Sequence, residues 1–594
     1  MIVIFCLLFC LTNAFESRIV NTHQGPVKGY KDDGLYSFYS VPYAKAPTGR
    51  DRFKAPLPAV ERPYVLEAVD KGIMCPQQDL SMMVKRSLLS TEDCLIANIF
   101  VPDTTKTNLP VVVYVHGGGY IACYGNLVTY KNLVKSKDVI VVTFNYRLGA
   151  HGFLCLGTED IPGNAGMKDQ VALLRWVKEN IANFGGDPEE VTIAGYSAGS
   201  SSVDLLMLSD TTKGLFKGVI PESGANTAAW SIQTDPIKNA QEYGQIISFT
   251  DYTNVEALQE FYKTVSYEIL TSGEMTLLNR TDSTFLMSPC VERETNEEEF
   301  LTESPVNILK SGKYNKVPML YGFASMEGLM RKDTFDQWKN EMNEDFVQFL
   351  PPDLQFKNDK EKAMVAEKIK KFYFGNEPVS NEKILSYVDF FSDVFFAYAT
   401  LRSIKLHVDA GHDKIYLYEY SFVHDDIPTI PYTNMRGATH CAQSSDVGDG
   451  NFTHFDEALF SKPARDMKKT VRDLWYNFVS TGQPVPEGSD FPSWPPVGKD
   501  STPYMVIDNP MRLSGSLLQE RTRFWDEIYS KHYRQPSPPS ITPTIDPGDR
   551  TLYLRDENRT LKPLGQYWPF IIYIYIILGI HLTNSGQYLY NQNL

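Results

Sequence analysis

The chain has 594 residues, of which 43% are hydrophobic and 22% charged, an ordinary globular composition that allows a large buried core. It carries 57 lysines and arginines against 72 aspartates and glutamates, a formal net charge of −15. Because an acidic surface repels phosphate backbones, we expect no nucleic-acid partner.

Residues 1–14 form an apolar run that ends in small and polar residues, as a cleaved secretory signal does. No lysine or arginine precedes the run, which departs from the usual signal. A membrane anchor or a buried strand is the alternative. We expect a secreted, extracellular protein, and three N-x-[ST] triplets fit that expectation. These candidate glycosylation sites are Asn279, Asn451 and Asn558.

From about residue 17 to 530, short apolar runs alternate with amphipathic stretches. The runs are rich in β-branched and aromatic residues on nearly every position, which is typical of parallel strands covered on both faces. They lie at 110–115, 138–144, 191–194, 317–321 and 415–420. The alternation predicts an α/β fold with a mostly parallel central sheet flanked by helices.

A Gly-Gly-Gly run, residues 117–119, follows His116 directly after the first of these strands. Without side chains, such a loop can approach a ligand closely and point backbone N–H groups at it, as an oxyanion hole requires. A hairpin turn is the alternative, but a turn alone does not require three glycines.

Apolar side chains then recur at helical spacing from Met167 to about Asn183, before Gly185 and Gly186, which can end a helix. The expected inner face holds Met167, Val171, Leu174, Val177 and Ile181, and the expected outward side chains are mostly Lys168, Arg175 and Lys178.

Residues 195–199 read Gly-Tyr-Ser-Ala-Gly, between the strand at 191–194 and a helix-like run at 200–208. A serine on a sharp strand–turn–helix junction is raised above the sheet, and the N–H groups of the following helix favour a developing negative charge beside it. We therefore predict Ser197 to be a catalytic nucleophile, with a surface turn as the alternative.

A serine hydroxyl needs a histidine base, and the base needs a carboxylate to orient it. The downstream acids are too numerous to choose among. The downstream histidines are His407, His412, His424, His440, His454, His532 and His581, and the pattern leaves this choice open.

Beyond residue 531 the chain changes character. Residues 535–548 are rich in proline and read as an extended linker. The apolar run at 570–580 falls short of the roughly 20 residues that a spanning helix needs, and the sequence ends in polar residues. We expect a signal at 1–14, a catalytic domain at 15–531 and a poorly ordered tail at 532–594, with weak membrane association of the tail as the alternative.

Several motifs in one order resemble the type-B carboxylesterase/cholinesterase family over nearly all of residues 17–530. Besides the two motifs above, the chain has Thr-Glu-Asp-Cys-Leu at 91–95, Asn-Tyr-Arg-Leu-Gly at 145–149, Gly-Asn-Ala-Gly-Met-Lys-Asp-Gln at 163–170 and Asn-Phe-Gly-Gly-Asp-Pro at 183–188. The resemblance implies an α/β-hydrolase fold and an esterase that needs no metal or organic cofactor.

The same resemblance implies roles for particular residues. Glu327 matches the family's acid, in a G-x-x-x-x-E-G pattern, and His440 matches its base, in G-x-x-H. The implied oxyanion hole comprises Gly118, Gly119 and Ala198, and the implied supporting serine is Ser223. The implied disulfide joins Cys75 to Cys94. We expect the remaining cysteines to be buried free thiols: Cys123, Cys155, Cys290 and Cys441.

Residues that differ from those usual in the family limit the classes of substrate that we expect. No tryptophan lies between Cys75 and Cys94, and Tyr196 stands where cholinesterases usually have glutamate, so choline esters are not expected. Juvenile-hormone esterases resemble the chain through Arg52-Phe53 and Asp169-Gln170, but they usually differ at Tyr196 and Gln443.

We therefore predict a secreted, insect-like carboxylesterase that acts on a small-molecule ester through Ser197, His440 and Glu327. The alternatives are a juvenile-hormone-esterase-like hydrolase and a non-catalytic adhesion or ligand-sequestering protein on the same fold.

Overall fold

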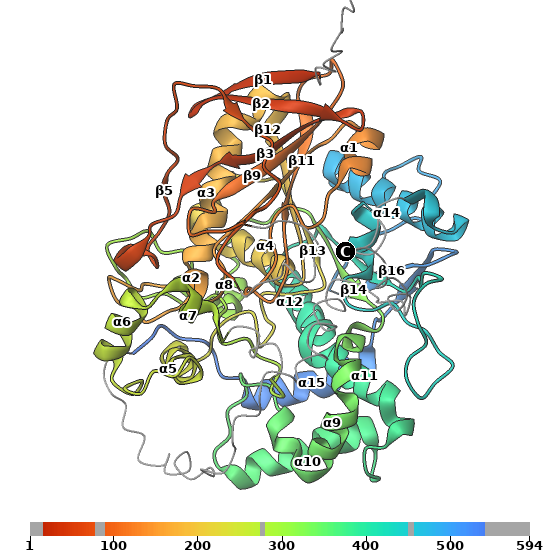
Figure 1. Cartoon of the computed structure of the whole chain (residues 1–594). Helices are drawn as coiled ribbons and strands as arrows, with labels where there is room; N and C mark the ends of the chain where they lie inside the picture. Colours follow the sequence, from red (N-terminus) through yellow and green to blue (C-terminus); the bar gives the residue numbers. More distant parts are fainter. Residues whose placement is uncertain (1–15, 78–88, 274–279, 450–456, 500, 541–594) are drawn as a thin grey trace, which may run out of the picture.

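The computed structural model describes residues 16–77, 89–273, 280–449, 457–499 and 501–540 (Figure 1). The expected signal at 1–14 and most of the expected tail lie outside these residues. So do Asn279, Asn451 and Asn558, the three candidate glycosylation sites.

One large sheet organises the described part of the chain (Figure 1). Its central strands pair in parallel in the order β11, β10, β12, β13, β14, β15, β16. They are β10 (Leu109–Val115), β11 (Ile140–Phe144), β12 (Gly186–Tyr196), β13 (Gly218–Glu222), β14 (Met319–Ala324), β15 (Ile415–Tyr420) and β16 (Pro503–Ile507). Antiparallel strands extend both edges: β1 (Ser17–Thr22), β2 (Gly25–Asp32), β3 (Leu35–Pro42) and β9 (Ile96–Pro102) on one side, and β17 (Arg512–Gly515) on the other. The expected mostly parallel sheet is confirmed.

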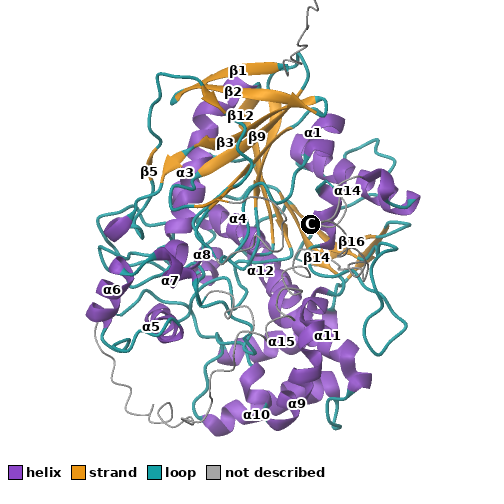
Figure 2. Cartoon of the chain, in the orientation of Figure 1, coloured by secondary structure: helices purple, strands orange, loops and turns teal. Residues whose placement is uncertain are grey.

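Side chains alternate between two cores because successive residues of a strand point to opposite faces. Val111 and Val113 of β10 enter one core, whereas Val112 and Tyr114 enter the other. Both faces are covered by helices (Figure 2). The first core is shared with α3 (Ala165–Asn180), α4 (Ala198–Leu208) and α12 (Tyr398–Asp409), and the second with α1 (Lys131–Lys137) and α14 (Lys462–Thr481).

The remaining elements surround this sandwich. Further helices are α2 (Gly149–Phe153), α5 (Pro236–Ile246), α6 (Val255–Thr264), α7 (Tyr267–Thr271), α8 (Pro305–Ser311), α9 (Phe335–Glu344), α10 (Asp359–Phe374), α11 (Ile384–Ser392), α13 (Ala442–Val447) and α15 (Gln519–His532). Short strands are β4 (Ala44–Lys45), β5 (Leu57–Pro58), β6 (Leu66–Glu67), β7 (Ile73–Met74) and β8 (Leu89–Ser90).

The helix expected from Met167 begins two residues earlier and continues as a 3₁₀ turn to Phe184, before Gly185 at φ 96°. One detail of that prediction is wrong. Lys168 is buried rather than outward, because its ammonium pairs with Glu292 at 2.9 Å and Glu297 at 3.1 Å.

Among the described residues, one helix is long and apolar enough to cross a membrane by length and composition. It spans 29 residues, Asn381–Asp409, and joins α11 to α12 through a π-helical turn, η8 (Asp393–Ala397). Most of its apolar stretch is buried inside the fold. We therefore assign this segment as a core helix of the fold.

The cysteines of the described chain form two disulfides, Cys75–Cys94 and Cys155–Cys290. The first is the pair that the family resemblance implies. The second corrects the expectation of free thiols at Cys155 and Cys290, since no sequence pattern signals two cysteines separated by 135 positions. Cys123 and Cys441 are free and buried.

Candidate active site

The predicted site residues gather where the central parallel strands end. The glycine loop follows β10, Ser197 follows β12, Ser223 follows β13, and Glu327 lies three residues after β14. Neighbouring parallel strands deliver their carboxyl ends to one edge of the sheet, which is where open α/β sheets bind ligands.

Ser197 occupies a strained turn between β12 and α4. Its backbone has φ 57° and ψ −122°, and its amide donates to the carbonyl of Glu222 at 2.9 Å. A Cβ on Gly199 would lie 2.1 Å from the carbonyl oxygen of Val115, so no larger residue fits there. Strain of this kind is retained at functional positions because it fixes a side chain where the chemistry needs it.

The glycine loop passes directly beside this turn. A Cβ on Gly117 would lie 2.9 Å from the Cβ of Ser197. Gly118 and Gly119 adopt positive φ of 104° and 63°, and a Cβ on Gly118 would lie 2.2 Å from the carbonyl oxygen of Ala122. The backbone therefore reaches Ser197 only because the loop lacks side chains.

Glu327 contacts His440 inside the protein. Its Oε2 lies 2.5 Å from Nδ1 of His440, and both side chains are fully buried. The other oxygen, Oε1, accepts the amide of Ala324 at 2.7 Å and the hydroxyl of Ser223. A carboxylate held by two donors and an imidazole is fixed in position, and it can orient the histidine.

Two backbone hydrogen bonds bring the loop of His440 to the loop of Glu327. The amide of Met326 donates to the carbonyl of Ala438 at 3.0 Å, and the amide of Ser325 donates to the carbonyl of Tyr420 at 2.8 Å. Of the downstream histidines within the described residues, His440 is the one that contacts Glu327.

The far edge of the His440 ring faces a thiol. Nε2 lies 3.3 Å from Sγ of Cys441, and the ring of Phe396 stacks on the imidazole with centroids 4.2 Å apart. Burial raises the pKa of Cys441 well above its usual range, while hydrogen bonds from Ser223 and from the backbone of Ser197 lower it. Cys441 therefore lies beside both the nucleophile turn and the histidine.

Other contacts of the site were not anticipated from the sequence. Gln443 donates its side-chain amide to Ser223 Oγ at 2.7 Å, so a chain of hydrogen bonds runs from Gln443 through Ser223 to Glu327. Gln443 and Cys441 lie within three positions of His440, and this proximity in the sequence could have indicated that they belong to the site. Phe396 is far from His440 in the sequence, and no sequence pattern indicated its contact with the imidazole.

The family model described as the carboxylesterase family matches residues 16–525 of the chain. The chain belongs to the carboxylesterase family.

Curated relatives agree with this assignment. A carboxylic ester hydrolase of Bombus ignitus is 31% identical over 86% of this chain and 94% of its own length. A juvenile hormone esterase of Heliothis virescens is 32% identical over 89% of this chain and 98% of its own length. These relatives and the family match make the chain a carboxylesterase.

Solved structures support the same fold. The juvenile hormone esterase of Manduca sexta, with OTFP covalently attached, superposes with a TM-score of 0.77 at 29% identity, covering 87% of this chain and 100% of that one. A PNB esterase superposes with a TM-score of 0.67 at 27% identity, covering 85% and 99%. The α/β-hydrolase fold is confirmed.

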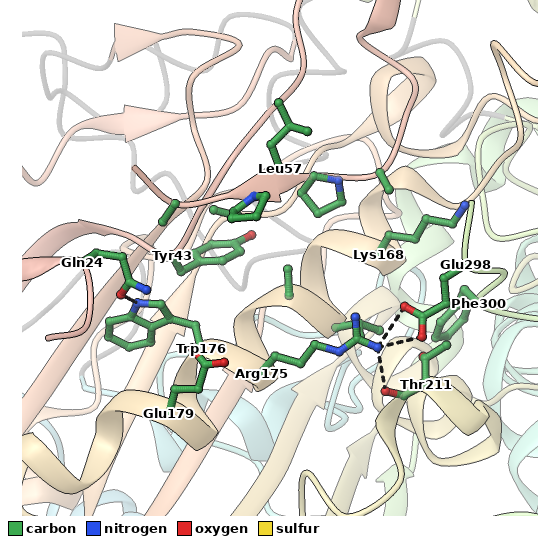
Figure 3. Close-up of a pocket in the computed structure, with 17 residues that line it drawn as sticks. Gln24, Tyr43, Leu57, Lys168, Arg175, Trp176, Glu179, Thr211, Glu298 and Phe300 are labelled. Carbon is green, nitrogen blue, oxygen red and sulfur yellow. Dashed lines mark hydrogen bonds and ion pairs between the residues drawn. The ribbon is translucent and has the colours of Figure 1, made fainter. Parts of the chain in front are cut away.

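A cavity of about 370 Å³ lies elsewhere in this carboxylesterase, between the β4–β5 segment and α3 (Figure 3). Its lining includes Tyr43 and Trp176, and at its rim Arg175 pairs with Glu298 at 2.9 Å. None of the predicted site residues lines it. Within the described residues, a smaller cavity of about 50 Å³ does adjoin His440.

Proposed function

We propose that this carboxylesterase hydrolyses carboxylic esters through an acyl-enzyme on Ser197, with His440 as base and Glu327 as the group that orients it. The observation that carries the proposal is the buried contact between Glu327 Oε2 and His440 Nδ1, 2.5 Å long, beside the strained turn of Ser197.

In the first half-reaction, His440 takes the proton of the Ser197 hydroxyl while its oxygen attacks the ester carbonyl. The backbone N–H groups of Gly118, Gly119 and Ala198 stabilise the tetrahedral oxyanion, at roughly 10²- to 10³-fold in rate for each donor. His440 then protonates the departing alcohol. In the second half-reaction, water attacks the acyl-enzyme by the reverse path and releases the acid.

Glu327 keeps the Nδ1 proton of His440 in place and stabilises the imidazolium that forms. The hydroxyl of Ser223 and the amide of Ala324 hold Glu327 in turn. The nucleophile, the base and the oxyanion donors are all groups of this chain, and water is the other reactant, so we propose no metal or organic cofactor.

We further propose that the protein is secreted. Residues 1–14 would be removed as a signal, residues 15–531 would form the catalytic domain, and residues 532–594 would form a tail with at most weak membrane contact. The two disulfides support an oxidising compartment. Asn279, Asn451 and Asn558 would then be available for glycosylation.

A juvenile-hormone-esterase-like activity is the second candidate, and the structural likeness to the Manduca sexta enzyme favours it. A non-catalytic adhesion protein is disfavoured, because nucleophile, base and acid positions are all filled. A ligand-sequestering protein is the third candidate. A sequestering protein would acylate once and release its product slowly.

The test is covalent labelling with a fluorophosphonate, followed by a screen of p-nitrophenyl esters of increasing acyl length. A choline ester and a terpenoid methyl ester would be included. We expect an adduct at Ser197 and steady turnover of activated esters. Absence of the adduct would favour an adhesion protein, and a burst without turnover would favour sequestration. Ser197→Ala is the control for both measurements.

A further inference from the structure

Glu222 is a fully buried carboxyl group next to the nucleophile turn. It is the last residue of β13, its carbonyl accepts the amide of Ser197 at 2.9 Å, and Ser223 follows it directly. Neither the sequence patterns nor the mechanism above assigns its side chain a role. Since burying a carboxyl is costly, its presence here requires an explanation.

The Glu222 side chain contacts three neutral groups on three elements. Oε1 accepts the indole N–H of Trp475 on α14 at 2.9 Å. Oε2 contacts the hydroxyl of Tyr114 on β10 and lies 3.2 Å from the hydroxyl of Ser444 on α13. In the described part of the chain, no lysine, arginine or histidine forms an ion pair with Glu222.

The titratable groups that respond to Glu222 are three phenols and a thiol, which are neutral when protonated. A negative charge on Glu222 would act on the phenols of Tyr114, Tyr130 and Tyr418 and on the thiol of Cys441, and would raise the pKa of each. Tyr418 and Cys441 also respond to Glu327, so the two carboxyls share a neighbourhood. A charged Glu222 would add a second buried anion there without a compensating cation.

The hydrogen-bond partners of Glu222 also allow a protonated carboxyl. The indole of Trp475 can only donate, and it is satisfied by the carbonyl oxygen of the acid. The hydroxyls of Tyr114 and Ser444 can accept as well as donate, so either can receive the acid proton on Oε2. Burial raises the pKa of Glu222 to about 8, against the hydrogen bonds from Tyr114, Ser444 and Trp475, which lower it.

Glu222 and Ser223 together form hydrogen bonds to α13, the helix that follows His440. Glu222 at the end of β13 contacts Ser444, and Ser223, the next residue, accepts from Gln443. Two consecutive residues at the end of β13 are therefore hydrogen-bonded to two consecutive residues of α13. Helix α13 begins two residues after His440. A shift of this helix would therefore move the imidazole.

We propose that Glu222 is a positioning residue that works as a neutral acid, holding α13, and with it His440, against the nucleophile turn. The proposal rests on the proposed ester hydrolysis. Ionisation of Glu222 would weaken catalysis, because a second buried anion would oppose the negative charge that develops on the substrate oxygen.

The variants Glu222→Gln and Glu222→Leu test this role in the full chain. The amide of Gln can accept from Trp475 and donate to Tyr114 and Ser444, whereas Leu can do neither. We expect Glu222→Gln to keep kcat within about threefold at pH 7, and Glu222→Leu to lower it about 10- to 100-fold with little change in KM. Ser444→Ala should lower kcat in the same sense but less.

The pH profile separates positioning from plain stability. Wild-type kcat should fall as pH rises through about 8, the pKa of Glu222, and this fall should be absent in Glu222→Gln. Glu292→Gln is the matched control, because it changes another buried carboxyl, one that pairs with Lys168 instead. This control should keep the wild-type profile.

Two outcomes would overturn the proposal: equal pH profiles for wild type and Glu222→Gln, or an undiminished kcat in Glu222→Leu. A wild-type protein that turns over no ester would instead refute the proposed function.

Thermal unfolding tests the protonation state of Glu222 even in that case. The ordinary pKa of 4.5 applies in the unfolded chain, so the fold loses stability as pH rises from there to about 8. Unfolding temperatures of Glu222→Gln relative to wild type should therefore rise between pH 6 and pH 9.

Discussion

Oε2 of Glu327 and Nδ1 of His440 lie 2.5 Å apart, and neither side chain is exposed to solvent. These residues are separated by 113 positions in the chain, and they follow neighbouring strands β14 and β15. The contact makes Glu327 an acceptor for the imidazole N–H, which leaves Nε2 as the nitrogen able to take a proton from a nucleophile.

Replacing Glu327 by Gln should nearly abolish ester hydrolysis. The amide can donate to Nδ1, which would favour the wrong tautomer of His440, and it cannot stabilise an imidazolium. We expect kcat to fall about 10⁴-fold, as removal of the charge does in other triads. Steady-state kinetics on a p-nitrophenyl ester measure the effect, and circular dichroism would show that the fold survives. A loss of less than tenfold would remove Glu327 from the mechanism.

Ser223 should support catalysis through Glu327 without contacting the substrate. Ser223→Ala removes a charge-assisted hydrogen bond to a buried carboxylate, and we expect kcat to drop about 10- to 100-fold with KM unchanged. Gln443→Asn shortens the donor that holds Ser223 and should give a smaller drop. The comparison requires both kcat and KM for each variant. An increase in KM with kcat preserved would instead indicate that Ser223 contacts substrate.

The two free thiols should not react with thiol reagents in the folded protein. Cys123 and Cys441 are buried, and burial raises the pKa of Cys123 to about 12 and that of Cys441 well above its usual range. A buried, protonated thiol is a poor nucleophile. Titration of the mature protein with Ellman's reagent should detect no thiol at pH 8 and two after denaturation. Rapid labelling of Cys441 with loss of activity would contradict this expectation.

The unanticipated disulfide should matter more for stability than the anticipated one. Cys155 and Cys290 are separated by 135 positions, Cys75 and Cys94 by 19. The chain-entropy model assigns about 5 kcal/mol to a loop of the first length and about 3 kcal/mol to the second. Urea unfolding of the two double Cys→Ala variants measures the difference. A larger loss from the Cys75–Cys94 variant would show that strain or packing outweighs loop entropy.

Local features of the fold could be predicted because they depend on neighbours in the chain. The apolar run before His116 and the Gly-Tyr-Ser-Ala-Gly turn define strand, turn and helix within about ten residues, and the structure has β10, β12 and α4 there. Lys168 shows the limit of such patterns. Its helical position predicts an outward side chain, but Glu292 and Glu297, more than a hundred positions away, hold it inside.

What the sequence alone determined is therefore the family, the α/β architecture and the turn that carries Ser197, since motifs and short-range periodicity encode them. Only the tertiary structure decided that Cys155 meets Cys290, that Gln443 donates to Ser223, and that Glu222 lies among neutral partners. Such contacts join distant segments, and the state of a buried carboxyl depends on the desolvation and partners that folding creates around it.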